Sequence, residues 1–352
     1  MLKAISNFYN SQKIARTLGA IVRASFVIAV AIIAEQALEV FLVPQVVYAE
    51  ESGQQIVQKQ AKVGHQYKYE IKIRKSLGLQ KDFGNPALSF QTLDHLLGKI
   101  EKKIKPKSKY NKREAIKALK VIGGVLKKEG NFEYRRNKLL IEGLKRQKNG
   151  KRFIDCDDYS SIYLVAGERL GLHLEPVYAP KHVFLMCKLN DSTRFYWEPT
   201  IAAEKDIGFY KDWLNIPEDS SYPKILNEKE FEAIHFCNLG VAWYEKGDYK
   251  KAIGYFKKAV KLSPNYAAAF NNLGVAYAKQ GNFDVAMECY RKATSINPNY
   301  AAAFSNIGVA FYKLSYLQKA VEYFDKAIEA DPKYDRAYDY KVVALMKIAE
   351  HN

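Results

Sequence analysis

The sequence predicts three parts in chain order: an N-terminal hydrophobic helix, an α+β domain and an all-α solenoid of helical repeats. Three observations predict them: an apolar run near the N-terminus, a change from helical to strand-like patterning in the middle, and a 34-residue repeat after Phe231. With 352 residues, 48% of them hydrophobic, the chain can form two domains with their own cores. This composition excludes a chain that is disordered throughout.

Residues 1–49 have the pattern of a signal peptide or a membrane anchor. Four basic residues and no acid lie within residues 1–23, and the apolar run ASFVIAVAIIA follows at 24–34. Cleavage after Ala49 would remove the segment, whereas an uncut segment over 18–43 is long enough for one spanning helix of ~20 residues. In both cases we expect the rest of the chain, after residue 49, to lie outside the cytoplasm, because the basic N-terminal flank stays on the cytoplasmic side of the membrane. A buried helix of a cytosolic protein is the alternative.

The α+β domain is predicted over residues 85–210, between linkers at 50–84 and 211–230. Apolar residues spaced three and four apart predict helices first, over residues 85–103, 112–130 and 134–147. Short runs rich in Val, Tyr, Phe and Trp then predict strands, over residues 174–179, 182–189 and 194–199. A group of helices followed by antiparallel strands is the order of an α+β domain.

Cys156 lies at the predicted start of a further helix, and His182 and Glu198 follow on two predicted strands. A helix N-terminus and a nearby imidazolium lower the pKa of a thiol and favour the thiolate, and a carboxylate on the second ring nitrogen orients the imidazole. We therefore expect an exposed nucleophile, a base and an orienting acid in that order. Three neighbouring acids oppose ionisation of the thiol: Asp155, Asp157 and Asp158. A buried, inert thiol is the alternative.

Two other residues near this trio are weaker candidates. His173 precedes a predicted strand and is the rival base, but the Pro-Lys-His-Val-Phe context favours His182. Cys187 follows Val183 and Leu185 on the same strand, so we expect it to pack in the core.

The segments around the trio resemble the transglutaminase-like cysteine hydrolase superfamily over roughly residues 85–205. The resemblance rests on CDDYSSIYLVAGERLGL from Cys156, APKHVFL around His182 and YWEPT around Glu198. It implies a papain-like core whose cysteine opens a helix and whose histidine and acid lie on adjacent strands. The family's usual acid before Pro-Thr is aspartate, whereas this chain has glutamate. An oxyanion donor is expected from the Cys156 N–H, with Gln147 or Asn149 as a second donor.

From residue 231 onward, equivalent residues recur every 34 positions. The recurring set includes glycine at 240, 274 and 308, alanine at 252, 286 and 320, and proline at 264, 298 and 332. Glycine and alanine let two helices approach closely, and proline stops the second helix. The pattern resembles the tetratricopeptide repeat (TPR). It predicts three TPR units over 231–332 and a capping helix over 333–352.

Asparagine recurs beside each Leu-Gly or Ile-Gly pair, at Asn238, Asn272 and Asn306. In TPR proteins this helix face lines the concave groove, and an amide can bond the C=O and N–H of an extended peptide. We predict a peptide-binding groove there, with a merely solvated polar ladder as the alternative. The lysines of a carboxylate clamp are replaced by Cys237, Val241 and Ala302, so capture of a C-terminal carboxylate is not predicted.

Of the net charge of +17, residues 99–152 carry the larger part, with 20 Lys or Arg against 5 Asp or Glu. Such a segment can attract an anionic surface. A lysine-rich solvated face is the alternative, and no specific nucleic-acid motif accompanies the charge.

Two functions therefore remain open from sequence. The first is a cysteine-dependent amide hydrolase or acyl transferase, peptidase-like, with a TPR module that binds a protein or peptide. The second is a non-catalytic TPR scaffold with a degenerate transglutaminase-like domain. Four scattered cysteines without C-x-x-C spacing argue against a disulfide framework and a zinc site, so no cofactor and no metal are predicted.

Overall fold

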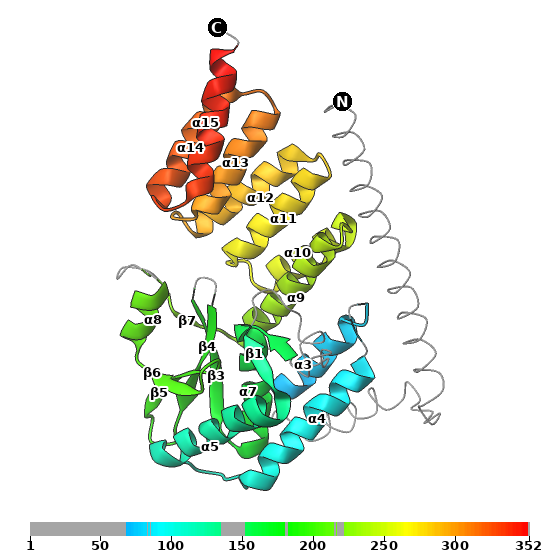
Figure 1. Ribbon diagram of the computed structural model, residues 1–352, viewed down its shortest axis with the longest axis vertical. Helices are drawn as coiled ribbons and strands as arrows, with labels where there is room; N and C mark the ends of the chain where they lie inside the picture. Colours follow the sequence, from blue (N-terminus) through cyan, green and yellow to red (C-terminus); the bar gives the residue numbers. More distant parts are fainter. Residues whose placement is uncertain are drawn as a thin grey trace, which may run out of the picture. The chain divides into compact units, whose positions relative to one another are not determined.

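The computed structural model describes residues 68–350 except 83, 85, 135–151, 180–181, 215 and 217–221 (Figure 1). These residues belong to a compact unit that spans residues 63–352. The predicted N-terminal helix, its cleavage site and the predicted helix over 134–147 lie outside the described residues. Within the described part of the chain, no helix has the length and apolar character needed to cross a membrane.

Helices form the first half of the α/β part, as the spacing of apolar residues predicts. The first three are α3 (Lys68–Leu79), α4 (Pro86–Lys103) and α5 (Lys112–Val125), and a π-helical turn at Leu126–Gly130 follows α5. The strand pair β1 (Phe132–Tyr134) and β2 (Arg152–Ile154) comes next, and the fourth helix is α7 (Cys156–Leu170). A capping box starts α5, because Asn111 accepts from the Glu114 N–H and Glu114 accepts from the Asn111 N–H.

Helix α3 lies in the segment predicted to be the 50–84 linker. Tyr69, Ile73 and Leu77 form an apolar stripe at four-residue spacing and are buried in the core. The adjacent Glu70 is completely buried between the guanidinium groups of Arg74 and Arg169. The linker prediction was therefore wrong for residues 68–79, and the four-residue spacing is the signal that indicates a helix.

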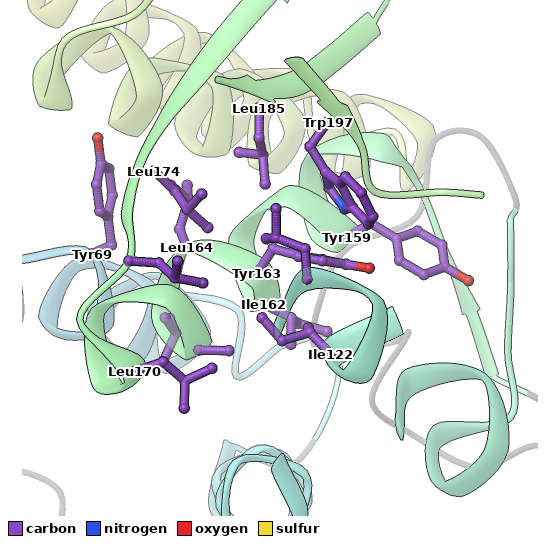
Figure 2. Close-up of a cluster of buried hydrophobic side chains, with 14 of the residues drawn as sticks. Tyr69, Ile122, Tyr159, Ile162, Tyr163, Leu164, Leu170, Leu174, Leu185 and Trp197 are labelled. Atoms are coloured by element: carbon purple, nitrogen blue, oxygen red, sulfur yellow. The ribbon is translucent and has the colours of Figure 1, made fainter. Parts of the chain in front are cut away.

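Five antiparallel strands form one sheet in the order β6-β5-β4-β3-β7. Their bounds are β3 (His173–Ala179), β4 (His182–Lys188), β5 (Arg194–Glu198), β6 (Ala203–Lys205) and β7 (Lys224–Ile225). On one face, Leu185 and Trp197 pack against Tyr163 and its neighbours on α7 (Figure 2). On the other face, Phe184 packs against Tyr210 of α8 (Ile207–Leu214). The predicted order, helices and then antiparallel strands, is the observed one.

The repeats are helical pairs with a close approach at one glycine in each pair. The pairs are α9 (Glu228–Glu245) with α10 (Tyr249–Leu262), α11 (Ala267–Lys279) with α12 (Phe283–Ile296), and α13 (Ala301–Lys313) with α14 (Leu317–Ala330). A Cβ on Gly240, Gly274 or Gly308 would lie 2.5–2.6 Å from an aromatic ring of the second helix. The recurring glycine is therefore a steric requirement of the pair.

The last helix, α15 (Asp335–Ala349), forms where the capping helix is predicted. It packs through Ala337 and Ala344, which are completely buried. Its outer face remains apolar, because Val342, Leu345 and Met346 are 45–62% exposed. In the preceding repeats the position of Val342 is the close-approach glycine, so this face has lost the contact geometry of a repeat pair.

Candidate functional site

His182 and Glu198 form a buried pair at one edge of the sheet. His182 begins β4 and Glu198 ends the antiparallel neighbour β5, so the two residues lie at the same end of the two strands. The His182 Nε2 and Glu198 Oε2 atoms are 2.7 Å apart, and the side chains are 4% and 1% exposed. Since Nε2 is used for Glu198, Nδ1 is the ring nitrogen left for a thiol.

The second carboxylate oxygen of Glu198 is held by Thr200. The Thr200 N–H donates to Oε1 at 3.1 Å and its hydroxyl donates at 2.5 Å. Both oxygens of the acid are thus engaged, which fixes the carboxylate plane toward the imidazole. The Glu-Pro-Thr segment therefore supports the orienting role that the sequence assigns to Glu198.

Aromatic rings surround the imidazole of His182. Phe184 and Tyr210 stack on it with ring centroids 6.1 and 6.3 Å away, and Trp213 contacts it edge-on at 4.9 Å. Tyr210 and Trp213 belong to α8, which lies in and beside the predicted 211–230 linker and which the sequence reasoning missed. The aromatic run in IGFYKDWL is the signal that indicates a packed helix there.

Cys156 is the first residue of α7, as predicted. Asp155 caps the helix by accepting from the Asp158 N–H at 3.3 Å. The backbone of Val183, the residue after His182, acts to lower the pKa of the Cys156 thiol. The Ser160 hydroxyl donates to the Val183 carbonyl at 3.3 Å and ties α7 to the same strand. The fold therefore brings Cys156 to the start of β4, where His182 lies.

The environment of the thiol differs from the expected one. Cys156 is only 7% exposed rather than open to solvent. Burial, together with the charges of Asp157 and Asp155, raises the pKa of Cys156 well above its usual range, even though the Val183 backbone works in the opposite direction. The expectation of an exposed thiol with a lowered pKa is therefore wrong for this conformation, because desolvation and two carboxylates outweigh the helix N-terminus.

The three aspartates at this helix start lie close together. One carboxylate oxygen from each of Asp155, Asp157 and Asp158 lies within 4.8 Å of the others. Burial and the charge of Asp157 raise the pKa of Asp155 well above its usual range, which favours a shared proton in this cluster. Carboxylate oxygens are the ligands that a hard cation prefers. However, the position of Asp155 is already explained by its role as the N-cap of α7.

Each asparagine of the ladder donates a side-chain hydrogen bond, and the one from Asn238 reaches the residue after Cys156. Asn306 donates to the Asn271 side chain at 2.8 Å, and Asn271 donates to Asn272 at 3.4 Å. Asn272 then donates to the Cys237 sulfur at 3.6 Å, and Asn238 donates to Asp157 at 2.7 Å. The second and third repeats are therefore linked to Cys237 by one series of bonds, and the first repeat is linked to the first turn of α7 by a separate one.

The weaker candidates are separated from this site. In the register of the β3–β4 hairpin, the residue opposite His173 is Lys188. The residue opposite His182 is Ala179, at the other end of the hairpin. His173 is exposed and contacts Glu175 at 3.2 Å. Cys187 is completely buried, and burial raises its pKa to about 12, so it packs as predicted. The oxyanion candidates Gln147 and Asn149 lie outside the described residues.

Comparison with known families identifies the repeats. A TPR repeat model matches residues 240–281 and 276–315, and a second tetratricopeptide repeat model matches residues 301–334. No curated protein matches the chain. These matches confirm tetratricopeptide repeats, which are a protein-interaction module, in the predicted segment. They give no support to the transglutaminase-like resemblance, because all the matched residues lie beyond the α/β part.

Solved TPR domains resemble the same region. The Aspergillus fumigatus Sgt2 TPR domain is 28% identical, with 34% of this chain and 82% of that chain covered and a TM-score of 0.33. The first TPR of Spaghetti (RPAP3), solved with the HSP90 peptide SRMEEVD, is 22% identical, with 35% and 97% covered and a TM-score of 0.33. The Arabidopsis OM64 TPR domain is 23% identical, with 34% and 96% covered and a TM-score of 0.32. The likeness concerns the repeat region alone.

Proposed function

We propose that this protein is a TPR scaffold that binds an extended segment of a partner protein along its asparagine ladder. The observation that carries the proposal is the ladder itself, in a segment that matches TPR models. Asn238, Asn272 and Asn306 are half-buried, and each donates a side-chain hydrogen bond. An amide nitrogen carries two hydrogens, so each retains a donor for a peptide carbonyl.

The expected ligand is an internal segment rather than a chain terminus. Cys237 occupies one position where a carboxylate clamp has a lysine. It is buried and accepts a hydrogen bond from Asn272, so this position has no positive charge to bind a terminal carboxylate. Binding through backbone groups predicts modest sequence selectivity. The buried Cys156, whose pKa is raised by its surroundings, is consistent with a domain that supports the repeats without using thiol chemistry.

A peptide-display selection against residues 63–352 tests this function. We expect selected peptides to bind about fivefold more weakly to Asn306→Ala, because one neutral hydrogen bond contributes about 1 kcal/mol. Asn282→Ala is the matched control, since Asn282 lies exposed in the turn before α12 and its side chain makes no capping bond. Equal binding to wild type, Asn306→Ala and Asn272→Ala would remove the ladder from the binding site.

A second candidate function is cysteine-dependent amide hydrolysis or acyl transfer. The observation that favours it is the buried His182–Glu198 pair at the start of β4, the strand to which Ser160 ties the first turns of α7. In this mechanism His182 takes the thiol proton, and the sulfur attacks an amide carbonyl to form a thioester as the amine leaves. Water or another amine then resolves the thioester. The reaction requires a conformation in which Cys156 is less buried.

The pH dependence of Cys156 alkylation separates the two functions. A scaffold thiol should react with iodoacetamide only at alkaline pH, and His182→Ala should not change its rate. A catalytic thiol should react rapidly near neutral pH and lose that reactivity in His182→Ala and partly in Glu198→Gln. Cys187 in the same digest, read by mass spectrometry, is the internal control for a buried thiol.

Export or membrane anchoring of the body also remains a proposal. It rests on the basic and apolar pattern of residues 1–49. Protease protection of the repeats in sealed spheroplasts would contradict it.

A further inference from the structure

Helix α5 and the π-helical turn that follows it expose a basic stripe on the side opposite their core contacts. The stripe residues are all exposed and recur at helical spacing: Arg113, Lys117, Lys120, Lys127 and Lys128. Gly124 lies between Lys120 and Lys127, and the space around its missing side chain is open. The opposite side of the helix buries Ala115, Leu119 and Ile122 completely. The charged residues along this outer line are therefore all cations.

The preceding loop and the end of α4 extend the stripe. Residues 102–128 contain 11 Lys or Arg and a single acid, Glu114. Glu114 is paired with Lys107 at 2.8 Å, and Lys112 is paired with Glu204 at 2.7 Å. Within the described residues, no ion pair joins any of the five stripe residues to an acid. The charge is thus available to an external anion.

The chemistry of the stripe discriminates between classes of polyanion. Ten of the 11 basic residues are lysine, a hydrated point charge, whereas planar recognition of phosphates and bases favours arginine. Single-stranded nucleic acid also needs aromatic rings for stacking, and the aromatic residue of this segment, Tyr110, is 7% exposed. A diffuse lysine surface instead suits the headgroup layer of an anionic membrane, where attraction depends on charge and proximity rather than on geometry.

We infer that the α5 stripe, residues 113–128, docks the α/β part on an anionic lipid surface. Docking leaves the asparagine ladder uninvolved, so the inference does not depend on either proposed function. Each lysine near such a surface strengthens association about fivefold. Replacing three of them should therefore weaken binding on the order of 100-fold.

Vesicle co-sedimentation of residues 63–352 tests the inference. The vesicles are phosphatidylcholine alone or with about 30% phosphatidylglycerol, in low salt and in about 1 M salt, where the Debye length is about 3 Å. The stripe variant is Lys117→Gln, Lys120→Gln and Lys127→Gln together. The matched control carries the same charge change on the repeats, as Lys250→Gln, Lys261→Gln and Lys292→Gln, three exposed lysines.

We expect binding only to the anionic vesicles, loss of binding in high salt, and a large loss in the stripe variant but not in the control variant. An equal loss in both variants would show that net charge alone drives binding and would overturn the inference. Absence of vesicle binding would also overturn it. So would an oligonucleotide that binds at lower concentration than the vesicles and depends on the same lysines. Circular dichroism of both variants checks that they fold.

Discussion

The α/β part and the repeats are held together by different kinds of buried group. The α/β part buries Glu70, His182 and Glu198 at 4% exposure or less, and each of them has a charged or hydrogen-bonding partner. The repeats instead bury alanines and aromatic rings, and their groove amides remain half-buried. Burying a charge is costly unless it has a partner, so the α/β part depends on a few long-range contacts. The repeats depend on the same short-range contact made several times.

The largest effect that this comparison predicts is at Glu70. Burial works against its ionisation, but hydrogen bonds and charge from Arg169 and Arg74 lower its pKa overall. Glu70→Leu leaves both guanidinium groups without this buried partner and should lower the free energy of unfolding by about 3–5 kcal/mol. The measurement is urea unfolding followed by tryptophan fluorescence.

Glu101→Gln is the control for Glu70→Leu, because Glu101 contacts the same Arg169 at 3.3 Å but is 40% exposed. It should cost less than about 1 kcal/mol. Since the folded pKa of Glu70 is lowered, its contribution is present above the ordinary carboxyl range and is lost as the pH falls through the folded value. Equal costs for the two variants would contradict the distinction between buried and exposed pairs.

The repeats should be most sensitive at a glycine, not at a charge. A Cβ at Gly274 would lie 2.6 Å from the Tyr290 ring and 2.9 Å from the Ala286 carbonyl oxygen. Gly274→Val should therefore destabilise the repeats by about 3 kcal/mol. Gly254→Ala is the matched control, because Gly254 has open space in the middle of α10, and it should stabilise by about 0.5–1 kcal/mol. Thermal unfolding by circular dichroism measures both, and a cost at both sites would contradict the steric account.

The contact between the two regions should have an intermediate effect. Asn238→Ala removes the 2.7 Å hydrogen bond to the Asp157 carboxylate and should cost about 2 kcal/mol, because hydrogen bonds to charged groups are the stronger ones. Asn306→Ala removes a bond between two neutral amides at 2.8 Å and should cost about 1 kcal/mol. Denaturant unfolding of both variants compares them, and the reverse order would contradict the stronger contribution expected from the bond between the two regions.

The smallest effect is a pH dependence at Glu168. Burial raises its pKa from 4.5 to about 7, although the Tyr69 and Glu70 N–H groups donate to its carboxylate. A raised carboxyl pKa means that its stabilising proton is present below about pH 4.5 and is lost as the pH rises through 7. The Glu168 proton should therefore make the free energy of unfolding larger at acidic than at mildly alkaline pH. Glu168→Gln should reduce this difference by about 1 kcal/mol, after allowance for solvent screening. An unchanged difference would remove Glu168 from the titration.

The sequence by itself determined the repeats, the helix start at Cys156 and the order of helices and strands. These features depend on spacing along the chain: a 34-residue period, a capping aspartate and alternating apolar runs. The close approach of Gly240, Gly274 and Gly308 to a ring recurs because the same local geometry recurs. Local physical causes leave a local pattern, which one sequence is enough to show.

Only the tertiary structure decided the state of the cysteine. The strand register joined His182 to Glu198, burial raised the pKa of Cys156, and α9 brought Asn238 to Asp157. The two contacts, His182–Glu198 and Asn238–Asp157, join residues that are not neighbours in the sequence. Desolvation depends on everything packed around a group, so no spacing along the chain predicts it. The sequence thus placed Cys156 at a helix start and His182 and Glu198 on neighbouring strands, and the packing buried the thiol and raised its pKa.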